Sequence, residues 1–252
     1  MTYVLITNDD GIDAPGIRSL AMAMQAMVDK VRIVAPATNQ SMSGHKITMF
    51  QDIQVEERTL LDIPSKAVHG SPADCISLAA LGVVDWPPRL VVSGINRGAN
   101  MGQDTFYSGT VSAALEATIQ GIPALAVSLD DPTADNVEAY EIAGRLAARV
   151  VARMIENGLP EFTLLNLNVP SGQDVKGMRL TKQGVRIYRD ELITSADGRT
   201  VQVAGEAPTG RTDELGTDLW AVHNGYASLT PLQIDLTAHD FLADLAAWDV
   251  ST

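Results

Sequence analysis

The stretch YVLITNDDG, residues Tyr3–Gly11, decides the fold of this 252-residue chain. Its first four residues are apolar and run directly into a polar turn, which predicts a strand buried on both faces. Helical patterns then separate further short apolar runs along the first two thirds of the sequence. Strands that alternate with helices predict a parallel sheet covered by helices on both sides. We therefore expect an α/β fold, a Rossmann-like three-layer sandwich with a mostly parallel sheet.

The apolar runs and periodic segments give a specific order of elements. The expected strands are residues 3–7, 30–35, 90–93, 124–129 and 162–169. The expected helices are residues 17–28, 72–81, 110–120 and 137–157.

After Pro170 the pattern changes, and shorter extended segments follow one another. Residues 178–189 and 200–203 form the arms of a predicted β-hairpin whose turn lies at 196–198. Further expected elements are strands at 219–222 and 226–230 and a terminal helix at 237–248. We interpret residues 1–176 as a catalytic core and 177–252 as a C-terminal extension for oligomerisation, both belonging to one unit.

Composition limits the partners of the protein. The formal net charge is −13, and such a surface repels nucleic acid polymers and anionic membranes. A phosphate substrate would be repelled as well, unless a bound cation reverses the field at the site. Cys75 is the only cysteine, so an internal disulfide is impossible. With no signal-peptide pattern and no apolar stretch of the roughly 18 residues a membrane span needs, we expect a cytoplasmic protein.

Polar side chains gather where the predicted strands end, which is where open parallel sheets bind ligands. Asp9 and Asp10 directly follow the first strand, and Asn96 follows the third. Adjacent carboxylates repel each other unless a cation lies beside them, and oxygen ligands of this kind suit Mg²⁺, Mn²⁺ or Ca²⁺. An Asp-Gly turn is the plain alternative for the pair alone. Together with Asn96 and Ser41, the pattern favours a metal site.

A second candidate feature is Ser108-Gly109-Thr110, which opens a predicted helix. The free N–H groups of a helix start can bind an anion such as phosphate. An ordinary Ser or Thr N-cap is the alternative for an isolated motif. Because the turn follows closely on the Asn96 loop, we expect phosphate between the metal and this helix, with Asn8 and Gly44 as further phosphate or substrate contacts.

Other candidates carry less weight. His45 could protonate a leaving group or hold phosphate, since imidazole titrates near working pH. Arg97 could neutralise phosphate or form a surface ion pair, and Cys75 fits a small core residue better than a nucleophile. The remaining histidines have no companions at metal-ligand spacing and are interpreted as structural: His69, His223 and His239. The Walker, dinucleotide-binding Gly-x-Gly-x-x-Gly and Gly-x-Ser-x-Gly signatures are absent from the positions where those chemistries require them.

These residues carry a resemblance to a known family that covers nearly the whole chain. The motifs that match, in order, are Thr7–Ile12, Val34–Pro36, Ser41–His45, Gly70–Cys75, Ser93–Asn96, Gly98–Gly102, Tyr107–Val111, Gly121–Ala124, Asn166–Pro170, Gly216–Asp218 and Thr230–Leu232. The chain resembles the SurE family of survival-protein nucleotidases. Ser71 stands where Thr is more usual, and residues 190–211 match only loosely.

The resemblance implies a SurE-like Rossmann core and assembly into a homodimer or homotetramer by exchanged elements of the extension. It also implies one divalent metal per subunit, held by Asp9, Asp10, Ser41 and Asn96. The implied activity is hydrolysis of nucleoside 5′- and 3′-monophosphates to nucleoside and phosphate, with some action on short polyphosphate.

A mechanism follows as a hypothesis. Asp9 or Asp10 would accept a proton from a metal-bound water, Asn96 and the Ser108–Thr110 turn would stabilise the phosphoryl oxygens, and His45 would protonate the leaving alkoxide. An aspartyl-phosphate route ranks second, because the enzymes that use it carry Asp-x-Asp at this strand, whereas the two carboxylates of this chain are adjacent. A response-receiver module would need an Asp at the third strand end and a Lys after the fifth, where this chain carries Asn96 and Asn168. A metal-gated nucleotide-binding protein without turnover would use the same ligands, so only product release separates it from an enzyme.

Overall fold

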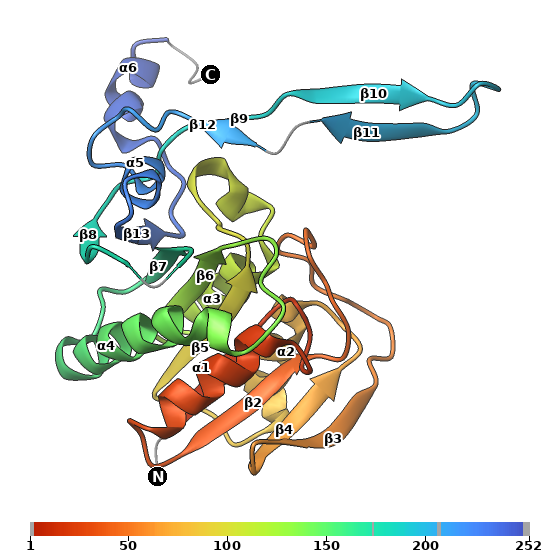
Figure 1. Cartoon of the computed structure of the whole chain (residues 1–252), viewed down its shortest axis with the longest axis vertical. Coiled ribbons are helices and arrows are strands. Elements are labelled where there is room, and N and C mark those ends of the chain that lie inside the picture. The colour runs from red at the N-terminus through yellow and green to blue at the C-terminus, as the bar shows by residue number, and fades with distance from the viewer. Residues whose placement is uncertain (1–2, 173, 206–207, 249–252) are drawn as a thin grey trace.

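The apolar run at the start of the chain forms β1 (Val4–Thr7), which lies in the middle of a nine-stranded sheet (Figure 1). The structure is a computed structural model, and it describes residues 3–172, 174–205 and 208–248. All four residues of β1 are buried, as expected for a central strand covered on both faces.

The first part of the chain alternates strands and helices. In order, the elements are β1, α1 (Pro15–Gln25), β2 (Val31–Pro36), β3 (Val55–Leu60), β4 (Ile63–Val68), α2 (Pro72–Leu78), the π-helix η1 (Ala79–Val83), β5 (Leu90–Arg97), the 3₁₀-helix η2 (Gly102–Phe106), α3 (Gly109–Ile119), β6 (Ala124–Asp130), the 3₁₀-helix η3 (Glu138–Tyr140), α4 (Glu141–Asn157) and β7 (Thr163–Pro170).

The second part is built of short elements. In order, they are β8 (Met178–Leu180), β9 (Arg186–Ile187), β10 (Asp190–Thr194), β11 (Val201–Gly205), β12 (Thr209–Gly210), α5 (Asp218–His223), β13 (Ala227–Gln233), the 3₁₀-helix η4 (His239–Phe241) and α6 (Leu242–Ala246).

The sheet has the order β3-β4-β2-β1-β5-β6-β7-β13-β8. Its six central strands, β4 to β7 in this order, are parallel, whereas β3 and β13 run antiparallel to their neighbours β4 and β7. The chain builds outward from β1 to β2 on one side and to β5 on the other. The switch in strand order therefore lies at β1 and β5, where a doubly wound sheet binds its ligands.

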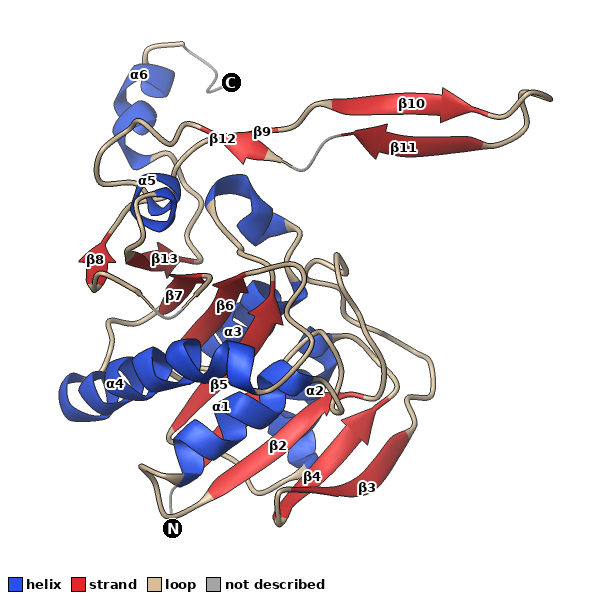
Figure 2. Ribbon diagram, in the orientation of Figure 1, coloured by secondary structure: helices blue, strands red, loops and turns tan. Residues whose placement is uncertain are grey.

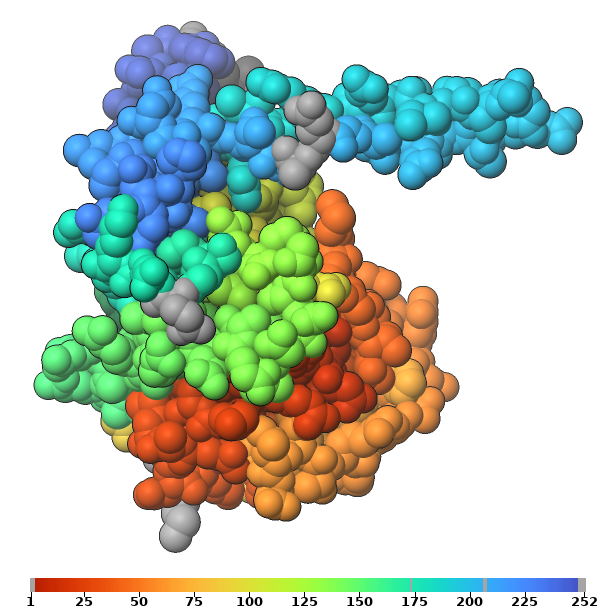
Figure 3. All heavy atoms as spheres, in the orientation of Figure 1, coloured from red at the N-terminus to blue at the C-terminus, as the bar shows by residue number. Residues whose placement is uncertain are grey.

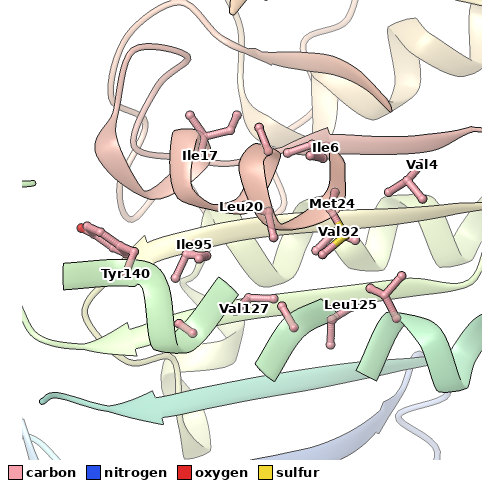
Figure 4. Close-up of a cluster of buried hydrophobic side chains, with 14 of the residues drawn as sticks. Val4, Ile6, Ile17, Leu20, Met24, Val92, Ile95, Leu125, Val127 and Tyr140 are labelled. Atoms are coloured by element: carbon pink, nitrogen blue, oxygen red, sulfur yellow. The ribbon is translucent and has the colours of Figure 1, made fainter. Parts of the chain in front are cut away.

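Helices cover both faces of the sheet, which gives the predicted three layers (Figure 2). On one face lie α1 and α4. The α1 side chains Ile17, Leu20 and Met24 pack in one cluster with Val4 and Ile6 of β1 (Figure 4). On the other face, α2 and α3 pack onto the sheet, and α3 presents small residues to it, namely Ala113, Ala114 and Ala117. Small side chains let α3 approach the sheet closely, which brings the start of this helix near the end of β1.

The α/β prediction is confirmed, and each of the expected core strands and helices occurs with shifted ends. The predicted hairpin also exists, with its turn at 196–198, but its arms are β10 and β11. Within the expected first arm, residues 178–180 instead join the main sheet as β8. Both β8 and β13 extend that sheet, so the C-terminal extension is continuous with the core.

Two expectations for the C-terminal extension are wrong. Residues 219–222 were expected as a strand, but they lie in α5, because the Thr217 side chain caps this helix by accepting from the Trp220 N–H over 3.2 Å. The expected helix at 237–248 is reduced to η4 and α6, neither of which has a buried residue. Helices this short need packing to be stable, and here the Phe241 and Trp248 rings contact each other edge to face at 5.6 Å between centroids.

The hairpin β3–β4 has no counterpart among the predicted elements. Its two-residue turn is formed by Leu61 and Asp62, both with positive φ (51° and 61°). Two-residue turns of this kind usually contain Asn-Gly or Gly. Because neither occurs here, the sequence did not predict this hairpin.

Candidate functional site

The predicted polar residues meet where β1 and β5 end. Thr7 at the end of β1 pairs with Ser93 of β5, so the residues that follow on the two strands are neighbours. A bulge between Ser93 and Asn96 interrupts the pairing of β5 with β6. Gly94 permits this bulge, because its φ is 137° and a Cβ there would lie 2.3 Å from the Val127 carbonyl oxygen.

Asp9 is the most enclosed acid of the site. It is 3% exposed, and its Oδ1 accepts a hydrogen bond from the Thr110 hydroxyl at 2.5 Å. The start of α3 lies directly on this side chain, since a Cβ on Gly109 would come within 2.8 Å of the Asp9 Cβ. Burial, with a smaller contribution from the neighbouring Asp10 charge, raises the pKa of Asp9 to about 7 against the lowering effect of the hydrogen bonds from Thr110. Such a carboxylate is unfavourable in its charged form unless a cation lies beside it.

Asp10 connects the ends of β1 and β5. Its Oδ2 accepts the backbone N–H of Arg97 over 3.0 Å. Burial raises its pKa, while this N–H and the Arg97 charge oppose the rise. Arg97 is therefore the nearby positive charge that the sequence suggested, and it acts on Asp10. A cavity of about 250 Å³ opens beside this carboxylate, with Arg97, Asn39 and Tyr140 in its wall.

Asn96 ends the bulged segment of β5 and is 9% exposed. Its Nδ2 donates to the Gly98 carbonyl over 2.8 Å, which fixes the amide and leaves Oδ1 as an acceptor. The next turn is held from below, where Asn168 and Asn166 bind the backbone of Asn100.

The loop after β2 lies over the same end of the sheet. The Gln40 N–H donates to the Asp9 carbonyl over 2.7 Å, next to the predicted ligand Ser41, which is exposed. The N–H of Gly44 donates to the Tyr107 carbonyl over 3.1 Å, just before the turn at Ser108. This loop therefore joins the acidic pair to the start of α3.

His45 is engaged elsewhere than at the acidic pair. Its Nε2 lies 3.0 Å from the buried Glu116 carboxylate on α3, and this contact lowers the pKa of Glu116. The role of His45 as an acid for the leaving group stays a prediction.

Ser108 caps α3, and its hydroxyl accepts the Val111 N–H over 3.1 Å. Thr110, the residue directly before Val111, contacts Asp9. The first N–H groups of a helix lack intrahelical partners, so this turn presents donors beside the acidic pair. One of them, the Thr110 N–H, bonds the Asp9 carboxylate itself. Asn8 is fully buried, and its Nδ2 holds the Gly11 carbonyl over 2.8 Å. The predicted contact of Asn8 with phosphate stays a prediction.

The donor set is rich in oxygen and poor in nitrogen and sulfur. Within residues 3–172, 174–205 and 208–248, no group of three or more His, Cys, Asp and Glu side chains is arranged to hold a metal. Two carboxylates, an amide oxygen and a hydroxyl form the predicted set, and such hard ligands suit Mg²⁺ or Mn²⁺. None of the ion pairs found in the described part of the chain involves Asp9 or Asp10, so a cation fits the electrostatics of this pair.

Some contacts of the site were not anticipated from the sequence. Thr110 was expected to bind phosphate, but its direct bond to Asp9 depends on how closely α3 approaches β1. Glu116, the partner of His45, carries no local motif that distinguishes it from a surface charge. Helices that could cross a membrane are also missing among the described residues, since none is both long and apolar enough.

Fold and centre together define a doubly wound α/β protein with an oxygen-rich centre at the switch point of its sheet. The family model described as Survival protein SurE matches residues 4–190. The chain belongs to the SurE family.

Relatives along the whole chain support the assignment. A Symbiobacterium thermophilum protein named 5′-nucleotidase SurE is 45% identical over 260 residues, with full coverage of both chains. A Chloroflexus aggregans protein of the same name is 43% identical over 253 residues, covering 98% of this chain and 99% of its own. The crystal structure of the SurE protein from Aquifex aeolicus superimposes with a TM-score of 0.84 at 35% identity, covering 98% of this chain and 99% of that one.

Proposed function

We propose that this protein is a divalent-metal-dependent phosphatase that releases phosphate from nucleoside monophosphates. The relatives named 5′-nucleotidase support the 5′-monophosphates as substrates. The 3′-monophosphates and short polyphosphate are further substrates that we propose from the family resemblance alone.

One observation carries the proposal. The buried Asp9 carboxylate lies between Asp10 and the start of α3, with Thr110 bonded to it. A cation beside the two carboxylates and a phosphate at the helix start would satisfy both halves of this arrangement. In the proposed holoenzyme, Asp9, Asp10, Ser41 and Asn96 hold one Mg²⁺ or Mn²⁺ ion. When bound, such an ion polarises a phosphate oxygen and lowers the pKa of a water molecule.

The residues of the chain supply the remaining steps. Thr110 holds the Asp9 carboxylate through its hydroxyl and its N–H, and Asp9 so held would bind the ion or accept a proton from water. The N–H groups at the start of α3 and the Asn96 amide bind the equatorial phosphoryl oxygens, where charge develops during transfer. Asp10 is fixed by the Arg97 N–H and serves as the second carboxylate ligand.

The functional test is phosphate release from nucleoside 5′- and 3′-monophosphates, short polyphosphate and p-nitrophenyl phosphate, each with EDTA, Mg²⁺ or Mn²⁺. We expect release that requires one of the two metals and is fastest with a nucleoside monophosphate. Tight nucleotide binding without release under any metal would instead support the non-enzymatic binding protein.

The C-terminal extension is proposed to assemble the protein into a homodimer or homotetramer. The hairpin β10–β11 projects from the body as an arm (Figure 3), and it carries exposed apolar side chains. Four of them are 52–70% exposed: Leu192, Ile193, Val201 and Val203. An isolated two-stranded hairpin is marginally stable in water, so contact with a second copy would stabilise it. The division into a core of residues 1–176 and an extension of 177–252, and a cytoplasmic location, stay predictions of the same standing.

A further inference from the structure

The C-terminal extension forms the projecting arm and also contacts the segment that leads into the site. Its residues bind η2, the one-turn helix that leads into the predicted phosphate-binding turn. The Gly102 N–H donates to the Oδ2 of the fully buried Asp218 over 2.8 Å. Gln183 donates to the Gly102 carbonyl over 3.0 Å and to the Thr105 hydroxyl over 2.9 Å. Both ends of η2 are thus held by residues that follow position 176.

Asp104 is the centre of this contact. Its Oδ2 accepts the Arg186 Nε–H over 2.6 Å, and its Oδ1 accepts the Tyr188 hydroxyl over 2.6 Å. The side chains of Arg186 and Asp104 are only 13% and 17% exposed, so water screens this ion pair less than the surface pairs. Both carboxylate oxygens of Asp104 are therefore committed to the extension.

The backbone of Asp104 continues toward the site. Its carbonyl oxygen accepts the N–H groups of Tyr107 and Ser108, each over 3.0 Å. Ser108 then caps α3, and Thr110 donates to Asp9. Hydrogen bonds linked by short backbone segments therefore connect Arg186 to the acidic pair.

We propose that the C-terminal extension is a working part of the active site, with Asp104, Arg186 and Tyr188 as positioning residues for the Ser108–Thr110 turn. They fix η2, and η2 fixes the direction in which the N–H groups of the turn face Asp9. This inference rests on the proposed function, because it assigns the turn to phosphate. It goes beyond that function by giving the extension a role in the phosphoryl-transfer step.

The same segment also carries the projecting arm. β9 begins at Arg186, pairs with β12 through Ile187 and Thr209, and continues into β10 at Asp190. Tyr188 contacts Tyr107 edge to face, with ring centroids 6.5 Å apart. The base of the arm and the entrance to α3 are thus a single packed unit (Figure 1).

The test measures kcat and KM of the full-length enzyme with a nucleoside 5′-monophosphate and saturating Mg²⁺. The variants are Asp104→Asn, Arg186→Gln and the double variant. We expect each single variant to lower kcat by about 10-fold or more with little change in KM, because small misplacements of transition-state donors reduce turnover strongly. The double variant should be about as slow as either single one, since both remove the same contact.

The matched control is Lys182→Gln. It removes the ion pair between Lys182 and Glu214, which are 2.7 Å apart within the extension and whose side chains are 67% and 39% exposed. We expect its kcat to stay within about 2-fold of the wild type, as is usual for exposed pairs. Multiplied losses in the double variant, or unchanged kcat in both single variants, would overturn the proposal.

Two further measurements separate positioning from loss of folding. Tyr188→Phe removes one hydroxyl and no charge, and a fall in kcat of about 5-fold is expected from one lost hydrogen bond. Hydrogen exchange at the amides of Tyr107 and Ser108 should speed up in Asp104→Asn, while exchange at Val151 in α4 stays unchanged. Unchanged exchange at both amides would contradict the positioning role of Asp104. Absence of phosphate release by the wild type would count against the proposed function alone, so the two failures can be told apart.

Discussion

At the residue scale, Asp9 shows how much of the site can be predicted from sequence. Two adjacent carboxylates after a buried strand indicate that a cation belongs there, and this signal is local. The Thr110 bond to Asp9 joins residues that are 101 positions apart, and it exists because α3 lies close to β1. No local pattern contains that distance, so the sequence predicted the members of the site better than their contacts.

The raised pKa of Asp9 gives a prediction for the metal-free protein. The folded state keeps a proton on Asp9 up to about pH 7, whereas the unfolded chain releases it near the ordinary pKa of 3.8. Folding stability should therefore fall as the pH rises from about 4 to about 7, by on the order of a few kcal/mol. Asp9→Asn lacks this loss, so in EDTA it should be more stable than the wild type at pH 8 and no more stable at pH 4.

Urea unfolding of both proteins at the two pH values measures this difference. Saturating Mg²⁺ should raise the stability of the wild type and leave that of the variant nearly unchanged. Equal stability of the two metal-free proteins at pH 8 would show that the fold does not disfavour the charged form of Asp9.

Gly109 allows the close contact between α3 and Asp9. In Gly109→Ala the new Cβ would lie 2.8 Å from the Asp9 Cβ and 3.0 Å from the Pro72 ring, so one of them must move. We expect a stability loss of about 1–3 kcal/mol and a fall in kcat of about 10-fold or more. Thr118→Ala changes the far end of the same helix and should leave kcat unchanged. Normal turnover in Gly109→Ala would show that the spacing between α3 and Asp9 is not critical.

At the scale of elements, the end of β5 depends on a buried polar network. Asn168 accepts the Asn100 N–H over 2.7 Å and donates to its carbonyl over 3.1 Å, and the Asn100 side chain donates to Ser128 over 2.8 Å. The sequence shows asparagines at these strand ends, but Asn100 and Asn168 were not among the predicted site residues. Their role in holding the turn after Asn96 became evident only from the structure, because it requires the order of β5, β6 and β7 in the sheet.

Asn168→Ala tests this network. It would leave the N–H of Asn100 buried without its partner, and we expect a stability loss of about 1–3 kcal/mol. The matched control is Asn157→Ala on the exposed end of α4, for which a change within about 0.5 kcal/mol is expected. Chemical denaturation measures both, and similar losses in the two variants would contradict a special role for the network.

Elements with ordinary local signals were predicted well, whereas others were missed or assigned wrongly. The start of α2 shows a capping box at Ser71 with Pro72 next to it, and the predicted helix begins at Pro72. The β3–β4 turn at Leu61-Asp62 has no glycine or asparagine, and α5 has strand-like residues but a Thr217 cap. In each failure, the deciding contact is either unusual for its residue types or made by a single cap.

At the scale of the whole molecule, the order of motifs along the chain predicted the family, and the family model and full-length relatives confirm it. What the sequence did not indicate is that the extension is bound to the entrance of α3. It was interpreted as a part for assembly, because its hairpin pattern gives no information on what its base contacts.

The projecting arm allows assembly to be tested separately from the site. Residues 192–203 can be replaced by Asn-Gly, which joins the paired positions Glu191 and Ala204 by a tight turn. We expect the wild type to sediment as a dimer or tetramer and the shortened protein to sediment as a smaller species. An unchanged molar mass in sedimentation equilibrium would show that the arm does not mediate assembly.

The measurement that tests the central claim most directly is phosphate release from a nucleoside 5′-monophosphate by the wild type and Asp9→Asn, in EDTA and in Mg²⁺ or Mn²⁺. Because Asp9 is the enclosed carboxylate between Asp10 and the start of α3, we expect release by the wild type only with metal. Asp9→Asn should lose most of it, by about 100-fold or more, while remaining folded. Near-normal turnover by the folded variant, or full release by the wild type in EDTA, would contradict a metal-dependent phosphatase centred on Asp9.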